Sequence, residues 1–131
     1  MHNKIKQVMA LIFLSAVVVT QSGCFGLLVG AAAGAGTFAF VNGDLEYNVD
    51  ASVEQAHSAS IRALRKLAVP VKQDVHDQHN AKIKSAYADG KDISISITAL
   101  TEKSSKIQIR VGVFGDQTRS ESILNTIQKY L

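Results

Sequence analysis

The sequence has little that would build a disulfide or a nucleic-acid-binding surface. It contains one cysteine among 131 residues, so it cannot form an internal disulfide. Its 14 lysine and arginine residues exceed its 11 aspartate and glutamate residues only slightly. Removing Lys4 and Lys6, which lie near the N-terminus, lowers the formal net charge from +3 to +1. A nearly neutral chain has no electrostatic basis for binding nucleic acid, and we expect none.

The sequence also lacks the residue patterns that are typical of enzymes. Ser120 and Ser122 have no nearby histidine that could activate a hydroxyl nucleophile. The segment 112–116, "GVFGD", is too short and wrongly placed for a phosphate-binding loop. We expect Gly115 to form a turn there and Asp116 to cap a helix. We therefore predict that the protein is not an enzyme and has no catalytic residue and no cofactor.

Histidine and aspartate gather in one short stretch, "DVHDQHN". Asp74, His76, Asp77 and His79 could bind zinc, which takes about four ligands in a tetrahedral array. The same residue types are common in turns, and we interpret the stretch as a turn that holds no metal. His57 lies at the edge of an apolar helical face, where we interpret it as a half-buried histidine with a hydrogen-bond partner.

Residues 1–23 are typical of a secretory signal peptide. Lys4 and Lys6 form a basic start without any acidic residue. The uncharged, strongly apolar run 8–20 follows, and it is shorter than the about 20 residues that a transmembrane helix needs. This order predicts an exported protein.

The single cysteine, Cys24, lies four positions after the end of this run. Ser22 and Gly23 before Cys24 resemble the lipobox of a bacterial lipoprotein signal, although Gln21 stands where leucine is usual. The resemblance implies cleavage before Cys24 and a lipid on its thiol, which would anchor the chain to a membrane. The alternatives are an uncleaved anchor and an ordinary signal peptide that leaves a free thiol. Phe25, rather than aspartate, favours the outer membrane, facing the periplasm, over the inner membrane.

A second apolar segment, 24–42, is rich in glycine and alanine. Gly26, Gly30 and Gly34 are spaced four residues apart, a small-xxx-small pattern that lets membrane helices approach closely. One interpretation is a short helix that enters the bilayer or associates weakly with a second copy. The other is a compact linker on the membrane surface, because glycine destabilises a helix in water.

The remaining residues, 43–131, predict a small α+β domain. Strands are expected where apolar and polar residues alternate, and helices where apolar residues recur every three or four positions. Ser52 and Gln55 resemble a capping box at the start of the first helix. The predicted order is a strand at 45–49, a helix at 53–67, strands at 69–75, 81–87, 92–98 and 106–113, and a helix that follows Asp116.

The apolar side chains fall on one face of each predicted element. The four later strands are joined by short turns, of which Asp89-Gly90 is one, so we expect an antiparallel sheet of about five strands with the first strand beside the last. Both helices would cover the buried face. The side chains expected on that face include Val53, Ala56, Ser60, Ala63, Leu64, Leu67, Ile93, Ile95, Ile97, Ile107, Ile109, Val111, Val113, Ile123, Leu124, Ile127 and Leu131.

Several stretches together resemble a known family. They are the segment ending at Cys24, the run "LLVGAAAGAGTFAFVNGDLE", the helix start "DASVEQA" and the ending "IQIRVGVFGDQTRSESILNTIQKYL". The chain is similar to small bacterial lipoproteins that form the domain-of-unknown-function family numbered thirty-five sixty-eight. The resemblance implies a place in the bacterial cell envelope, and it implies no activity.

Two functions remain open from the sequence. The first is a membrane-anchored structural or protein-interaction module that presents a sheet face or a strand edge to another envelope protein. The second is a small carrier that holds a lipid or another apolar ligand in the periplasm, between the sheet and the helices. The carrier needs spare volume in the core, which a domain of this length can hardly supply. We therefore favour the interaction module.

Overall fold

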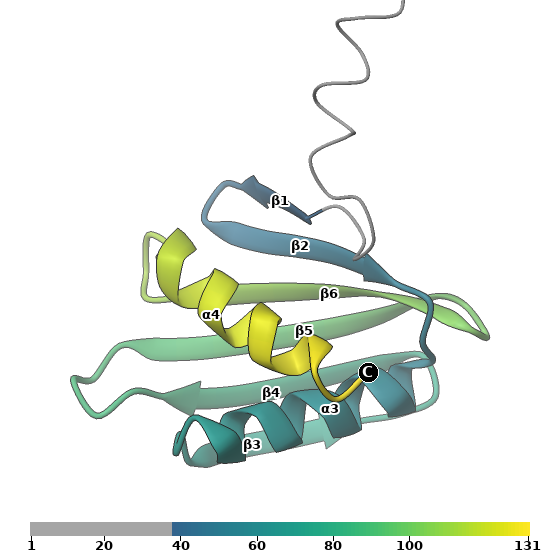
Figure 1. Cartoon of the computed structure of the whole chain (residues 1–131), viewed down its shortest axis with the longest axis horizontal. Helices are drawn as coiled ribbons and strands as arrows, with labels where there is room; N and C mark the ends of the chain where they lie inside the picture. The colour runs from purple at the N-terminus through teal and green to yellow at the C-terminus, as the bar shows by residue number, and fades with distance from the viewer. Residues whose placement is uncertain (1–37) are drawn as a thin grey trace, which may run out of the picture. The chain divides into compact units, whose positions relative to one another are not determined.

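Alternating apolar and polar residues build one antiparallel sheet (Figure 1). The structure, a computed structural model, describes residues 38–131. Its strands lie in the order β1-β2-β6-β5-β4-β3. The elements are β1 (Phe38–Val41), β2 (Asp44–Val49), α3 (Val53–Lys66), β3 (Val71–His76), β4 (Asn80–Ala86), β5 (Asp92–Thr101), β6 (Ser104–Val111) and α4 (Gln117–Gln128). The predicted α+β class is confirmed, and the first predicted strand, β2, pairs with the last strand, β6.

The sheet has one strand more than the sequence analysis predicted. Phe38–Val41 was assigned to the apolar segment 24–42, but it pairs with β2, so the sheet begins before the predicted domain boundary at residue 43. Asn42 and Gly43, with φ angles of 52° and 90°, form the turn between the two strands. Asn-Gly suits a two-residue hairpin because both central residues need positive φ. This turn makes residues 38–41 a strand instead of the end of a linker.

Several sequence predictions concern residues that precede β1. The signal peptide 1–23, Cys24 and the glycines Gly26, Gly30 and Gly34 lie outside the described residues. Among residues 38–131, no helix is both long enough and apolar enough to cross a membrane.

Helix α3 begins and ends close to the residues that the sequence predicts, and nearby side chains explain both boundaries. The backbone N–H of Gln55 donates to Ser52 Oγ at 3.2 Å, and the N–H of Ser52 donates to Gln55 Oε1 at 3.0 Å. This reciprocal pair is the predicted capping box. The helix ends at Lys66, and Pro70, which has no N–H to donate, follows before β3. Its inner face buries Val53, Ala56, Ser60, Ala63 and Leu64 as predicted, and Leu67 is half-buried.

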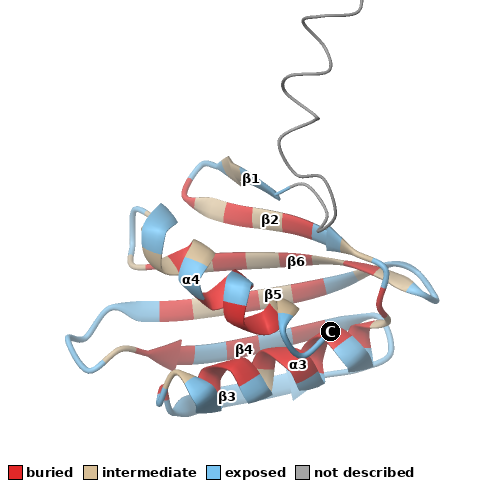
Figure 2. Ribbon diagram, viewed as in Figure 1, coloured by how far each residue is buried: buried red, intermediate tan, exposed pale blue. Residues whose placement is uncertain are grey.

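Both helices lie on one face of the sheet, and the core fills the space between the helices and the sheet (Figure 2). The isoleucines of β5 and β6 share one core with Ile123, Leu124 and Ile127 of α4, and these side chains are at most 1% exposed. A void large enough for water would leave accessible surface on the side chains around it. The absence of such surface on these side chains indicates a tightly packed core.

Two side chains that were predicted to be buried are exposed. Val113 was placed on the inner face of the last strand, but it is 81% exposed because β6 ends at Val111. Gly112, with a φ of 73°, turns the chain out of the sheet. The alternation of apolar and polar residues therefore continues in the sequence after the strand has ended. Leu131 lies beyond the end of α4 and is 44% exposed.

The turn before α4 agrees with its predicted role. Asp116 caps the helix, since its Oδ1 accepts a hydrogen bond from the N–H of Arg119 at 3.1 Å. Gly115 has a φ of 83° and lies against the backbone of Gly43, where a Cβ would collide. This contact joins the β1–β2 turn to the start of α4. Ser120, in the first turn of the helix, is fully buried.

Candidate interaction surface

The face of the sheet opposite the helices is open and polar. In β5, Ser94, Ser96 and Thr98 alternate with the buried isoleucines, so they lie on this open face. Lys84 of β4 is the cross-strand partner of Ser94, and Lys82 is the partner of Ser96. The centre of the open face therefore carries hydroxyl groups and two exposed lysines.

Charges are balanced on the β2–β6 side of the open face. The Nε of Arg110 donates to Asp44 Oδ1 at 2.6 Å, and the Asp44 carboxylate raises the pKa of Arg110. The ammonium of Lys106 lies 3.7 Å from Glu46 Oε2, and the amide of Gln108 donates to Glu46 Oε1 at 2.9 Å. Because each cation faces a carboxylate, this side has little net charge to offer a partner.

The β3–β4 side of the same face differs in charge. Within residues 38–131, neither Lys82 nor Lys84 forms an ion pair with a carboxylate. Both side chains are exposed. Their ammonium groups can therefore bind acidic or hydrogen-bond-accepting groups of a partner.

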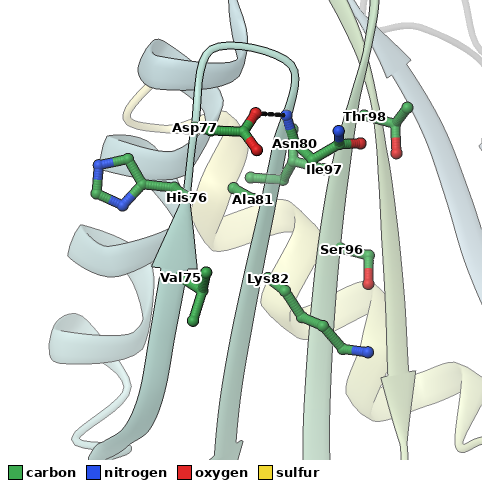
Figure 3. A pocket seen from close by; sticks show the side chains of 9 residues that line it. All are labelled: Val75, His76, Asp77, Asn80, Ala81, Lys82, Ser96, Ile97 and Thr98. Carbon is green, nitrogen blue, oxygen red and sulfur yellow. Dashed lines mark hydrogen bonds between the residues drawn. The ribbon is translucent and has the colours of Figure 1, made fainter.

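A shallow hollow of about 290 Å³ lies on this lysine-bearing side (Figure 3). In this view the helices lie behind the sheet, and Lys82 and Ser96 occupy neighbouring strands beside the hollow. Its volume lies just below the range for small-molecule sites, about 300–1,000 Å³. The hollow therefore suits a protruding group of a larger partner. Its lining residues are Val75, His76, Asp77, Asn80, Ala81, Lys82, Ser96, Ile97 and Thr98.

The edge strand β3 borders this hollow. Among the strands of residues 38–131 it pairs only with β4, and all six of its residues are exposed, including Val75 at 59%. The free edge of a strand presents backbone N–H and C=O groups that a partner strand can pair with. The open face and a free edge thus meet at β3.

The second half of the stretch "DVHDQHN" forms the predicted turn. Asp77 Oδ1 accepts hydrogen bonds from the backbone N–H groups of His79 at 2.7 Å and Asn80 at 2.8 Å. These two N–H groups hold the pKa of Asp77 below its ordinary value. Asp77 therefore has the structural role that the sequence predicts for the whole stretch.

The first half of that stretch is strand, which corrects the turn prediction. Asp74 and His76 lie in β3, with their side chains on the helix-covered side, since they pair with Ile83 and Ala81. There the Nε2 of His57 lies 2.7 Å from Asp74 Oδ1. The predicted hydrogen-bond partner of His57 is present, but His57 is only 9% exposed, so it is buried more deeply than the predicted half-buried histidine.

The comparison with known proteins identifies a family without an activity. A family described as a protein of unknown function (DUF3568) matches residues 7–130, nearly the whole chain. This confirms the resemblance seen in the sequence. No curated protein matches the chain.

Proposed function

The chain belongs to this family of unknown function, and we propose that it is a lipid-anchored envelope protein that binds another envelope protein through the open face of its sheet. The anchor would be a lipid on Cys24, which the residues Ser22 and Gly23 before it support. The outer membrane, facing the periplasm, is the favoured location. The proposed role is binding, without catalysis.

The uneven charge of the open face is the observation that carries this proposal. Arg110 and Lys106 face carboxylates of their own chain, whereas Lys82 and Lys84 have none in ion-pair contact among residues 38–131. The hollow of about 290 Å³ beside Lys82 supports binding at the same place. The partner surface is therefore expected to be acidic or rich in carbonyl groups.

The alternative function, a carrier of an apolar ligand, has weaker support. Between the sheet and the helices, Ile95, Ile109, Ile123 and Ile127 have no accessible surface. A lipid chain could enter only if these side chains moved apart, and the lost packing would cost several kcal/mol. Native mass spectrometry of the protein purified from cells tests the carrier, since a retained small apolar molecule would favour it over the interaction module.

Crosslinking in cells tests the binding face. A photoreactive amino acid at Ser96 lies on the open face, and the same amino acid at Ser58 lies on an exposed position of α3. We expect Ser96, but not Ser58, to give a discrete adduct with an envelope protein. Adducts of equal yield from both positions, or none from Ser96, would contradict the proposed face.

Replacing Cys24 with serine tests the anchor. The thiol would be lost, so we expect the variant to lose palmitate labelling and either leave the membrane fraction or remain as an unprocessed precursor. The wild-type chain, which should be labelled with palmitate, is the control. Equal palmitate labelling of both chains would rule out lipid attachment at Cys24.

A further inference from the structure

Two histidines and one aspartate meet between α3 and the edge strand β3. Asp74 and His76 are two residues apart in β3, so their side chains lie on the same side of the strand. His57 comes from α3, which packs on that side. One potential ligand atom from each residue lies within 4.8 Å of the other two.

The distances within this cluster suit a metal ion. His57 Nε2 lies 2.7 Å from Asp74 Oδ1, and His76 Nδ1 lies 3.7 Å from the same oxygen. Zinc bonds of about 2.0–2.2 Å in a tetrahedral array separate the ligand atoms by about 3.3–3.6 Å. The two distances, 2.7 and 3.7 Å, lie on either side of this range, so shifts of about 1 Å would bring the atoms into a coordination shell.

A hydrogen bond that joins helix α3 to strand β3 does not explain why His57, Asp74 and His76 all gather there. The hydrogen bond between His57 and Asp74 alone would join α3 to β3. His76 makes no hydrogen bond to the carboxylate, because its Nδ1 lies 3.7 Å from Asp74 Oδ1, so it adds only a stacked ring and a longer charge contact. A third ligand atom close to the same oxygen is what a metal site requires.

The two imidazole rings differ in how far they can move. They are stacked, with their centroids 4.1 Å apart and their planes inclined by 26°. The side chain of His57 is 11% exposed and held by its surroundings, whereas that of His76 is 52% exposed. The His76 ring can therefore turn out of the stack and direct its nitrogen to an ion held by the other two residues.

We propose that His57, Asp74 and His76 bind a divalent transition-metal ion, with zinc as the best match. Imidazole nitrogen and carboxylate oxygen are ligands that zinc takes, and the neighbouring first-row metals share them. Three protein ligands leave one position for water or for a donor group of a partner. The ion would connect α3 to the exposed edge strand β3, the strand that borders the proposed binding face.

Zinc titration of the untagged full-length chain in detergent, after removal of metal with a chelator, tests the site. We expect calorimetry to give one zinc ion per chain and thermal unfolding to move to higher temperature with added zinc, since binding to the folded state alone stabilises it. Cobalt in place of zinc should give the visible absorption of a tetrahedral site.

Two single histidine variants make the test specific. His76→Ala should weaken zinc binding by at least about tenfold and remain folded, because the side chain is exposed. His79→Ala is the matched control, since His79 lies in the adjacent turn, outside the cluster, and it should bind zinc like the wild type. No zinc binding by the wild-type chain, or equal affinities of the two variants, would overturn the proposal.

Discussion

The two faces of the sheet differ completely although they are built by the same strands. In β5, Ile95 has no accessible surface, while its neighbour Ser96 lies on the open face. Within residues 38–131 both helices lie on one face, and neither covers the other (Figure 2). On the covered side the side chains serve packing, so substitutions there should act on stability. On the open side they are available for binding, so substitutions should act on partners and leave the fold intact.

The largest contrast is expected from adjacent aspartate substitutions in β5. Ile95→Asp places a charge in the packed core without a partner, which costs several kcal/mol against a total stability of about 5–15 kcal/mol. We expect the variant to be unfolded by circular dichroism. Ser96→Asp, one residue further, should unfold within about 0.5 kcal/mol of the wild type. Equal effects of the two variants would mean that the faces are wrongly assigned.

Two glycines sharpen the comparison between packed and open regions. Gly115 and Gly90 both have positive φ, but a Cβ collides with the backbone of Gly43 at the first and meets nothing within 4 Å at the second. Gly115→Ala should lower the free energy of unfolding by about 2–4 kcal/mol, from strain and collision together. Gly90→Ala should cost about 1 kcal/mol, from the backbone angle alone. Urea unfolding measures both, and equal losses would disprove the close packing of Gly115 on Gly43.

Two valines test where the covered face ends. Val111 is 1% exposed and Val113 is 81% exposed, although they continue the same alternation in the sequence. Val111→Ala should cost about 2 kcal/mol of stability, because it removes buried apolar volume. Val113→Ala should cost less than about 0.5 kcal/mol. A similar loss at both positions in urea unfolding would mean that the strand continues past Gly112.

The smallest expected effect is an acid dependence of stability that comes from Asp89, in the turn between β4 and β5, and Asp116, the N-cap of α4. The Arg119 side chain, and then the N–H of Lys91, hold the pKa of Asp89 below its ordinary value. The N–H of Arg119, and then the Lys91 ammonium, do the same for Asp116. A lowered pKa in the folded state adds stability above the unfolded value, about 4, and this stability disappears as the pH falls through the folded value.

Thermal unfolding between pH 6 and pH 3 measures this effect. Asp116→Asn keeps a good helix cap and removes the charge, so it should lose less stability on acidification than the wild type. Stability that rises toward pH 3 in the wild-type chain would contradict the direction of both pKa shifts.

Local patterns predicted most of the fold because local chemistry determines them. The Ser52–Gln55 capping box, the Asp116 cap and the isoleucine alternation all involve residues within a few positions of one another, and all are present in the structure. The missed strand Phe38–Val41 shows the limit of such reasoning. Its four apolar residues continue the preceding apolar run, and only the Asn-Gly turn marks them as half of a hairpin.

The candidate sites were harder to predict because they join distant residues. His57 and Asp74 are 17 positions apart, and they meet because α3 packs on the inner side of β3. The sequence pattern groups Asp74 and His76 with Asp77 and His79, which are their neighbours in the chain. The strand directs the first two toward the helix, while the turn uses the backbone around Asp77. Grouping by sequence therefore combined two unrelated structural roles.

By itself, the sequence determined which residues alternate, where the helices begin, and that a lone cysteine follows an apolar run. These features depend on neighbouring residues and are readable without a fold. Only the tertiary structure decided which lysines lack a carboxylate, which strand is left at the edge, and which histidines meet. The physical reason is that charge balance, edge exposure and ligand convergence depend on distances in space, which the packing of helices on the sheet sets.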